Sequence, residues 1–502
     1  MTRFDCDLAI LGSGFGGTLL AVIARKLGYS VALLERGRHP RFAIGESSTP
    51  LSNFKLARIA DHFGLDWLRP FAKYGTWKAT YPDITCGLKR GFGFFRHERG
   101  RPFGARDDNA NALLVAASPD DSVSDTQWLR AEFDAYVVAR AVEAGVPYLD
   151  ECEIRDVRHD SRGWELNGTR PDGAVQARAK LLVDASGTGQ VLADALGIGQ
   201  TDPSALKVRS RALYSHFTGV ARWQDLLEGE FGRSATTGHP FRCDDSTIHQ
   251  IIDGGWMWII RFDNGVTSAG FSLDPDVHPL RPDETAEDEW RRLLNTYPSL
   301  ARQFASATPV RPFVRTGRLQ RRLTQAAGPD WAMLPHTAGF LDAWLSPGIA
   351  QTLFAVSRLG YILAEERTER GRERRLLEYN RTVLRELAWV DEITGTCFAC
   401  FDRFPVLATA SMLYFVAAIY CEERERNGEA GPDDAFLLAD HGAFRDLAWD
   451  IFRRAVRTPA EDAERFAEGV RDRIAPYNLG GLCDPARRNM YPFITGPAPQ
   501  KA

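Results

Sequence analysis

The sequence predicts an α/β fold in which a Rossmann-like nucleotide-binding domain is interleaved with a β-rich substrate domain and followed by a helical region. A strand–turn–helix–strand unit opens the chain, strand-like alternation returns in two later stretches, and the residues after about 365 are mainly helical in pattern. With 502 residues, 44% of them hydrophobic, the chain can bury a large core. We expect a core over 1–365, with substrate-domain segments at about 50–125 and 200–325, and a helical region over 366–502.

The chain opens with a βαβ pattern. Residues 7–11 form a short apolar strand, 12–17 a glycine-rich turn, 18–27 a helix with one apolar face, and 30–34 a second strand. This order is typical of the start of a Rossmann-like domain.

Later segments continue the alternation of strands and helices. Residues 125–145 have the pattern of a long amphipathic helix, whereas 151–183 and 245–273 alternate like strands. Residues 331–364 return to a strand, a turn and a helix, and the helical pattern then continues to a proline-rich tail. Segments of the nucleotide domain are therefore expected to interleave with the substrate domain.

Composition excludes several classes of partner. The net charge of −4 gives no electrostatic reason to expect nucleic acid or an anionic membrane. The longest uncharged apolar run, 404–420, falls short of the roughly 20 residues of a bilayer span, so we interpret it as a buried helix and expect no membrane contact. The N-terminus has no signal-peptide layout, and a cytoplasmic protein is the resulting expectation.

The cysteines carry little chemical information. All eight are spread along the chain without the spacing of a disulfide framework, which fits a reducing compartment. Cys397 and Cys400 form a lone CxxC in an apolar, helical stretch. A zinc site would need a second ligand pair, and none is evident, so we interpret the two as core residues and expect no metal.

Residues 12–17, Gly-Ser-Gly-Phe-Gly-Gly, match the GxGxxG pattern of dinucleotide-binding turns. Gly12 permits the tight turn, Gly14 lets the backbone approach a pyrophosphate, and Gly17 lets helix and strand pack closely. Glu35 ends the next strand, where a carboxylate can accept hydrogen bonds from a ribose diol. The alternative is a glycine-rich turn without a nucleotide, and the motif alone does not separate FAD from NAD.

A second motif favours FAD. Residues 181–187, Leu-Leu-Val-Asp-Ala-Ser-Gly, resemble the strand that re-enters the nucleotide domain in FAD monooxygenases of the aromatic-hydroxylase type. Arg130 lies on the preceding helix, where that superfamily usually has an arginine near the flavin. A solvated helix face is the alternative interpretation of Arg130.

Further segments, in order, resemble the flavin-dependent halogenases. The first corresponds to the loop along the flavin face and the second to the segment with the family's active-site lysine. The third matches most of the WxWxIP signature, and the last two match the region that holds flavin and halide. These segments are 39–50 (HPRFAIGESSTP), 86–92 (CGLKRGF), 255–260 (GWMWII), 334–342 and 346–349, and the resemblance covers roughly residues 5–365.

This resemblance implies the site residues. Lys89 would be the catalytic lysine rather than a surface lysine, and Trp256 and Trp258 would wall a tunnel, although both could simply be core residues of a strand. Halide would lie against Ser346, Gly348 and Ile349, at the start of a helix. The implied FAD-binding residues are Gly12, Gly14, Gly17, Glu35, Arg36, Arg41, Gly45, Glu46, Ser47, Arg130, Asp184, Gly187 and Asp342.

Three departures from the family pattern bear on the substrate. Arg261 stands where the signature has proline, Leu345 where tryptophan-type halogenases have glutamate, and Ala343 where the family's Asp-Pro has proline. Tryptophan needs a carboxylate to steady the arenium ion, whereas phenols and pyrroles are activated by their own heteroatom. We therefore expect an electron-rich phenol or pyrrole, free or attached to a carrier protein. Residues that could assist, among which the sequence does not choose, are His62, His97, His249 and Asp342.

The resemblance also implies the reaction. Reduced FAD reacts with O2 to give a C4a-hydroperoxide, halide attacks it, and Lys89 directs the released hypohalous acid onto the substrate in specialised metabolism such as antibiotic biosynthesis. FADH2, O2 and chloride or bromide are thus the expected co-reactants. No second GxGxxG follows a strand, so a separate flavin reductase is expected. The alternatives are an FAD-dependent aromatic monooxygenase and a flavin-free binding protein, the latter disfavoured by the intact nucleotide motif.

Overall fold

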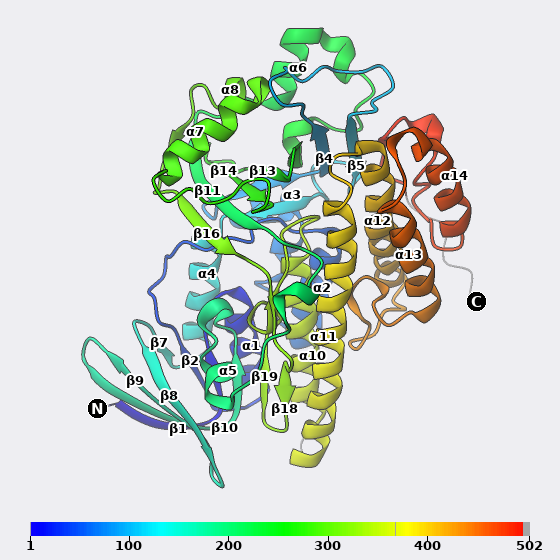
Figure 1. The fold of residues 1–502 in the computed structure, drawn as a ribbon. Coiled ribbons are helices and arrows are strands. Elements are labelled where there is room, and N and C mark those ends of the chain that lie inside the picture. The colour runs from blue at the N-terminus through cyan, green and yellow to red at the C-terminus, as the bar shows by residue number, and fades with distance from the viewer. Residues whose placement is uncertain (1, 367, 495–502) are drawn as a thin grey trace.

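An eight-stranded sheet forms the lower part of the computed structural model, which describes residues 2–366 and 368–494 (Figure 1). Its strands run in the order β18-β19-β10-β1-β2-β7, and β8 and β9 extend it as an antiparallel hairpin from β10. The strands from β19 to β7 are parallel, as a Rossmann-like domain requires. Their bounds are β1 Thr2–Leu11, β2 Val31–Leu34, β7 Tyr148–Leu149, β8 Glu153–Asp160, β9 Gly163–Arg170, β10 Gly173–Asp184, β18 Ala327–Gly328 and β19 Trp331–Met333.

Helices cover this sheet because their apolar faces meet its buried strands. Ten of the twelve residues of α1 are buried, and α10 packs against both α1 and α2. The two-stranded ladders β3–β6 and β17–β20 lie outside both large sheets. The bounds are α1 Phe15–Lys26, α2 Pro50–Phe63, α3 Tyr74–Thr80, α4 Arg130–Glu143, α5 Val191–Leu196, α9 Pro335–Ala338, α10 Gly348–Glu365, β3 Cys86–Lys89, β6 Asp125–Trp128, β17 Arg321–Arg322 and β20 Gly339–Phe340.

A nine-stranded sheet forms the upper part of the molecule. Its strands come from segments on both sides of the β7–β10 region, and its last strand, β21, comes from near the C-terminus. One face packs on α6, α7 and α8 through a separate apolar cluster. The bounds are β4 Gly91–Arg96, β5 Ala112–Ala116, β11 Arg211–Thr218, β12 Thr247–Ile252, β13 Gly255–Arg261, β14 Thr267–Leu273, β15 Thr308–Pro309, β16 Val314–Arg318, β21 Met490–Tyr491, α6 Trp223–Phe231, α7 Ala286–Thr296 and α8 Pro298–Gln303.

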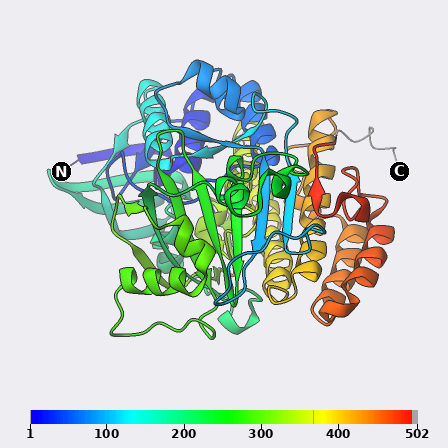
Figure 2. The same ribbon diagram turned by 90° about the horizontal axis from the view of Figure 1, so that it is seen from above.

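The C-terminal helices pack against the other face of the nine-stranded sheet. Trp256 and Trp258 of β13 share one apolar cluster with α11 and α12, and both views show these helices beside β4 and β5 (Figure 2). Among the described residues only α12 is long and apolar enough to cross a membrane, and 83% of its most apolar window is buried in the protein. The bounds are α11 Glu369–Phe398, α12 Phe404–Arg426, α13 Gly442–Ala455 and α14 Ala463–Ile474.

Most of the predicted elements are present, and the fold class is confirmed. The prediction of one helix over 125–145 was wrong at its start, because Asp125–Trp128 form β6 and the helix begins at Arg130. Strand β21 interrupts the region predicted as helical, because Met490–Tyr491 pair in parallel with β5. Cys397 and Cys400 are both buried in the apolar core, as expected for core residues.

Candidate active site

The glycine-rich turn forms a cradle for a phosphate. Gly12 has φ +95°, and a Cβ there would lie 2.6 Å from the carbonyl oxygen of Ala185, so only glycine fits. A Cβ on Gly17 would lie 2.2 Å from the carbonyl oxygen of Gly12. A Cβ on Gly14, by contrast, would clash with nothing, since its nearest neighbour would be Nη2 of Arg130 at 3.7 Å. Helix α1 begins beside Gly14 with no side-chain cap, which leaves its first N–H groups for an anion.

Glu35 is fixed beside this turn. Its carboxylate accepts hydrogen bonds from the N–H and hydroxyl of Ser13 (2.9 and 3.0 Å), the N–H of Gly37 (2.8 Å) and the guanidinium of Arg41 (3.1 Å). Burial opposes ionisation, but the charge of Arg41 and these hydrogen bonds outweigh it and lower the pKa of Glu35. Nε of Arg41 and Nδ1 of His39 are buried without a partner among the described residues. This corner therefore has spare polar atoms for a nucleoside.

Arg130 connects the glycine-rich turn to the loop of residues 39–48. Its Nη1 donates to the carbonyl oxygens of Ile44 and Gly45, both at 3.0 Å. Its other nitrogens donate to Asp134, and the guanidinium carbon lies 4.7 Å from the ring centroid of Phe15. The predicted arginine is thus buried and holds the loop, and it is not on a solvated helix face.

Asp184 and Gly187 lie where the central strand β10 ends. The Asp184 carboxylate accepts from the N–H and hydroxyl of Ser186 and from the N–H of Leu192, so its side chain stabilises the turn after the strand. Gly187 has φ +68° and its N–H donates to the hydroxyl of Thr337, which joins this turn to α9. Arg36 is exposed beside Glu35.

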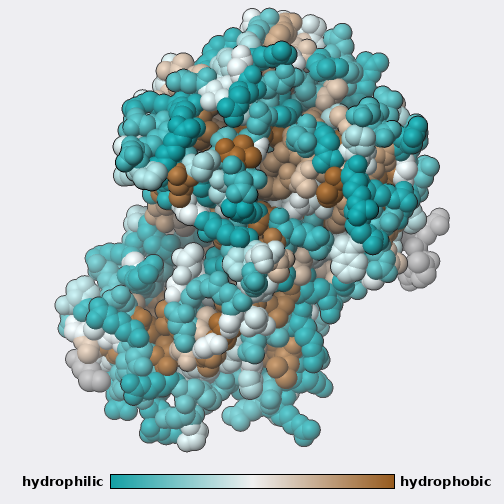
Figure 3. Space-filling view, viewed as in Figure 1, coloured by the Kyte–Doolittle hydropathy of each residue, from teal (hydrophilic) through white to brown (hydrophobic). Residues whose placement is uncertain are grey.

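These residues fit FAD, although the structure contains no ligand. The uncapped start of α1 suits the pyrophosphate, and the spare polar atoms near Glu35 suit the adenosine. Figure 3 shows hydrophobic side chains gathered in the recess between the lower and upper parts of a mostly hydrophilic face. A planar apolar ring system would be accommodated by such a surface.

Lys89 is fully buried at the end of β3. Its Nζ donates to the hydroxyl of Ser47 (2.9 Å) and the carbonyl oxygen of Ser48 (2.6 Å), and lies 3.9 Å from the ring centroid of Phe92. Burial lowers the pKa of Lys89 to about 7, and the nearby Asp125 only partly opposes the effect. Both the ammonium and the amine are therefore accessible near neutral pH.

Ser47 links the lysine to the segment that leads into α10, residues 345–348, where halide binding is predicted and which we call the halide loop. Its hydroxyl oxygen lies 2.9 Å from Nζ of Lys89, 3.1 Å from the hydroxyl of Ser346 and 2.7 Å from the hydroxyl of Thr247. The neighbouring Glu46 is held through one oxygen by His216 (2.8 Å), and its other oxygen is buried without a partner among the described residues. Residues 45–48 thus touch the cofactor side and the lysine side of the site.

The expected tunnel wall is an aromatic cluster fixed by one carboxylate. Asp342 accepts hydrogen bonds from Nε1 of Trp256 (3.2 Å) and the N–H of Trp344 (2.9 Å). Its second oxygen accepts from the hydroxyls of Ser210 and Ser272 at 2.8 and 2.7 Å. Burial raises the pKa of Asp342. Because this carboxylate is fully engaged, it anchors the wall, and a contact of residue 342 with flavin stays a prediction for its backbone alone.

The two predicted tryptophans differ in their surroundings. Trp256 lies against His249 and Trp344, with ring centroids 5.1 and 5.2 Å apart, whereas the indole N–H of Trp258 donates to Ser268. Both are buried on the face of β13 toward the C-terminal helices, 5.9 Å from each other. Their role as a tunnel wall remains a prediction.

The halide loop is strained. Leu345 and Ser346 have φ +64° and +56°, values that non-glycine residues rarely adopt, and functional loops often hold such strain. Helix α10 then begins at Gly348 without a side-chain cap, so the N–H groups there can hold an anion. A Cβ on Gly348 would lie 3.0 Å from Nε2 of His336, whose pKa burial and nearby arginines lower to about 4.

Arg261, the departure from the family signature, has a structural function. Its guanidinium donates to Asp244 (2.9 Å) and to the carbonyl oxygens of Val220 and Ala221, which anchors the end of β13. Its own carbonyl oxygen would lie 1.9 Å from a Cβ on Gly87, so the strand of Lys89 packs directly on this backbone.

The structure separates the candidate assisting residues. His97 bonds Gln250 inside the other apolar cluster, and His62 stacks on Tyr361 near the surface. His249 alone of the three histidines lies in the aromatic cluster around Trp256, with Nε2 buried and without a partner among the described residues. Burial lowers the pKa of His249 to about 3, so it is a neutral ring there.

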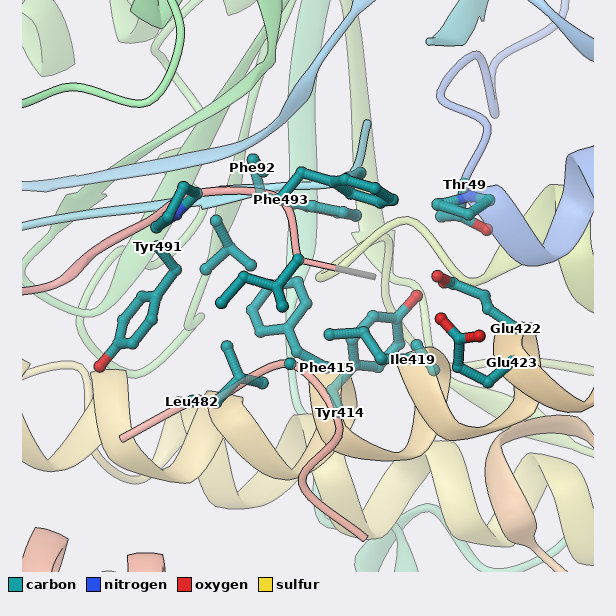
Figure 4. A pocket seen from close by; sticks show the side chains of 18 of the residues that line it. Thr49, Phe92, Tyr414, Phe415, Ile419, Glu422, Glu423, Leu482, Tyr491 and Phe493 are labelled. Atoms are coloured by element: carbon teal, nitrogen blue, oxygen red, sulfur yellow. The ribbon is translucent and has the colours of Figure 1, made fainter. Parts of the chain in front are cut away.

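A pocket next to Lys89 was not predicted from the sequence. It is a partly open hollow with about 630 Å³ of empty space, including the part open to solvent, and Phe92 separates it from the Lys89 ammonium. Phe92, under the Lys89 ammonium, and Thr49, which follows Ser48, form part of its wall (Figure 4). Phe415 and Glu422 of α12 form the wall opposite Phe92, and Phe493 of the C-terminal segment lies beside Phe92 (Figure 4). In the sequence, the pocket could have been inferred only from the segment that forms α12, which is apolar on all sides and ends in charged residues.

Comparisons with known proteins agree with this geometry. The family model described as tryptophan halogenase matches residues 127–403, more than half of the chain. The chain therefore belongs to the flavin-dependent halogenases, which are oxidoreductases that use FAD as FADH2, O2 and chloride or bromide.

Individual relatives sharpen the placement. The chain is 29% identical over 490 residues to tetracycline 7-halogenase of Kitasatospora aureofaciens, covering 92% of this chain and 86% of that protein. It is 28% identical to monodechloroaminopyrrolnitrin halogenase PrnC of Pseudomonas fluorescens, covering 82% and 71%. The fold matches the crystal structure of halogenase PltM in complex with phloroglucinol and FAD, with a TM-score of 0.85, 23% identity and coverage of 97% and 99%.

Proposed function

We propose that this halogenase directs hypohalous acid through Lys89 onto an electron-rich aromatic substrate of the phenol type, bound in the pocket beside Phe92. The proposal is supported mainly by the position of Lys89 between the halide loop and the pocket. Through Ser47 it is linked to Ser346 of the halide loop, and through Phe92 it borders the pocket. An oxidant formed on the halide side would therefore meet the lysine before the substrate.

The chemistry of Lys89 follows from its surroundings. When bound, reduced FAD together with O2 and halide supplies hypohalous acid. The ammonium of Lys89 can donate a hydrogen bond to the acid's oxygen and make the halogen more electrophilic, whereas the amine could accept the halogen itself. A pKa of about 7 keeps both routes open. The buried aromatic wall around Trp256 keeps bulk water from the oxidant.

Two observations support the substrate class: the halide loop has no glutamate before Ser346, and several relatives are named for, or were crystallised with, pyrrole or phenol compounds. Leu345 replaces the glutamate of tryptophan-type enzymes, so the ring must be activated by its own heteroatom. Relatives are named for tetracycline and for a pyrrole held on a peptidyl carrier protein, and PltM was crystallised with phloroglucinol. We therefore propose a phenol-type ring, free or carrier-bound, with a pyrrole as the second class, in cytoplasmic specialised metabolism.

Product analysis tests this function. The enzyme is supplied with FAD, a flavin reductase and NADH, with chloride or bromide, and a panel of phenols and pyrroles is examined by mass spectrometry. Halide-dependent mass shifts on phenols are expected, and Lys89→Ala and Lys89→Met should lower them at least about 100-fold while FAD affinity is retained. Hydroxylated products whatever the halide would favour the monooxygenase alternative, and an active Lys89→Ala would make Lys89 structural.

Electron supply is a separate proposal. We infer that a distinct reductase delivers FADH2, because the sequence offers one dinucleotide turn and the described fold assigns it to the cofactor of the first domain. In stopped-flow absorbance, NADPH alone should leave the bound flavin oxidised over the turnover time, and added reductase should restore turnover. Rapid direct reduction by NADPH would refute this proposal.

A further inference from the structure

The pocket beside Lys89 has one polar side. Most of its lining is apolar, including Phe92, Phe415 and Phe493. Glu422 and Glu423 extend from α12 on the side of Thr49, opposite Tyr491 and Leu482 (Figure 4). An aromatic ring bound between the apolar walls would thus place its polar substituent at this side.

The two glutamates differ in how they are engaged. Glu423 forms an ion pair with Arg426 of the same helix, which holds its carboxylate. Glu422 is only 7% exposed and has no hydrogen bond or ion pair to any residue between 2 and 494 that the structure describes. Its carboxyl group therefore faces the pocket without a protein partner, and a ligand that donates a hydrogen bond would stabilise its charge there.

Charges from several elements face Glu422. Asp125 of β6 lies near it and repels its negative charge, whereas Arg426 of α12 and Lys73, just before α3, attract it. Glu423 and Tyr414 are further titratable neighbours on α12. Burial, followed by the charge of Asp125, raises the pKa of Glu422 to about 8.

We propose that Glu422 is the general base that accepts the proton of a phenolic hydroxyl in this pocket and so selects substrates with an ionisable hydroxyl group. The proposal rests on the proposed function and adds the group that recognises the substrate. Asp125 connects Glu422 to the lysine electrostatically, because its charge acts on Glu422 and it lies opposite Lys89 in the β3–β6 ladder.

Halogenation of the phenol would begin with a proton transfer. The phenolic O–H proton moves to a carboxylate oxygen of Glu422, and electron density from the phenolate oxygen enters the ring. A ring carbon bonds the halogen of hypohalous acid, the halogen–oxygen bond breaks, and hydroxide leaves. That carbon then loses its proton, which forms water with the hydroxide, and Glu422 returns the first proton to the oxygen. Hypohalous acid and the arene thus give halogenated phenol and water.

Proton affinity favours a phenol over a pyrrole for this site. A base with a pKa near 8 lies about two units below a phenol such as tyrosine, whose pKa is about 10, so the transfer is accessible. A pyrrole N–H is a far weaker acid, and its proton would not move to a carboxylate. An ordinary exposed carboxylate would also be a much weaker base than Glu422.

The test compares the best phenol of the panel with its O-methyl ether, which keeps the ring and lacks the proton. Wild type, Glu422→Gln and the matched control Glu423→Gln are assayed for halogenated product, with FAD titration as the folding check. We expect Glu422→Gln to lose at least about 10-fold with the phenol and little with the ether. Glu423→Gln should keep the wild-type ratio of phenol to ether.

A pH series separates this role from a structural one. The ratio of the wild-type rate to the Glu422→Gln rate on the phenol should rise with pH up to about 8 and then level off, because Glu422 accepts a proton only when it is ionised. Ionisation of Lys89 or the flavin changes both rates equally and therefore does not affect the ratio. An unchanged phenol-to-ether ratio in Glu422→Gln, or a pH-independent rate ratio, would overturn the proposal while halogenation itself stands. Absence of halogenated phenol from wild type would instead refute the proposed function.

Discussion

The cofactor end and the lysine end of the site are built in contrasting ways. The cofactor end is centred on one short stretch, in which the turn after β1 and the end of β2 lie close in sequence and are held by hydrogen bonds such as those of Glu35, and only a few residues such as Arg130 join it from elsewhere. The lysine end is assembled from distant segments. Ser47, Lys89, Ser346 and α12 meet only in the folded chain. A site built from neighbouring residues suits a cofactor that many proteins share. Because the lysine end is assembled from distant segments, the residues around the pocket can change without disturbing the cofactor end.

The largest expected effect tests the cofactor end alone. Gly14→Val makes no backbone clash, since its Cβ would be in ordinary contact with the side chains of Arg130 and Asp134, but it would block approach of the pyrophosphate, so FAD affinity should fall by about 100-fold or more with the fold intact. Isothermal titration with FAD measures the affinity, and circular dichroism checks the fold. Gly17→Val serves as the contrast, because it clashes with the backbone of Gly12 and should destabilise the protein itself. Unchanged FAD binding by Gly14→Val would mean that the cofactor lies elsewhere.

An intermediate effect tests the junction between the two ends. Ser47→Ala removes the hydroxyl that joins Lys89 to Ser346, and Lys89 keeps only its bond to the carbonyl oxygen of Ser48. We expect halogenated product to fall about 10-fold, with more oxidant lost to solution per flavin oxidised. The yield of product per O2 consumed measures this coupling. Equal yields in the variant and wild type would show that the lysine and halide loop act independently.

A third effect concerns stability rather than activity. Burial lowers the pKa of Lys89 from 10.5 to about 7, so between these values the unfolded chain binds a proton that the folded protein does not. The free energy of unfolding of wild type should therefore rise with pH across this window relative to Lys89→Met, by up to about 1.4 kcal/mol per pH unit. Urea unfolding at pH 7, 8 and 9 gives the comparison. A constant difference between the two proteins would mean that Lys89 is not desolvated.

The sequence predicted what is local and missed what is not. The GxGxxG turn and Glu35 were found because each is defined by its neighbours in the chain. Asp125 was assigned to a helix, since a four-residue strand pairing with Cys86–Lys89 leaves no periodic signal of its own. Glu422 was overlooked because its burial depends on a helix, a sheet edge and the C-terminal segment meeting around it. Lys89 was found through family resemblance, since its residue type alone indicates a surface position.

The loop of residues 39–48 has a consequence for engineering. Gly45 is held by Arg130 beside the glycine-rich turn, and two residues later Ser47 is bonded to Lys89. A designer who wishes to exchange the substrate wall can replace residues of α12 and the C-terminal segment, whereas this loop must be transplanted together with both of its partners. If the proposed function holds, the loop, Arg130 and Lys89 should be kept together in a designed variant, whereas the lining of the pocket can be changed.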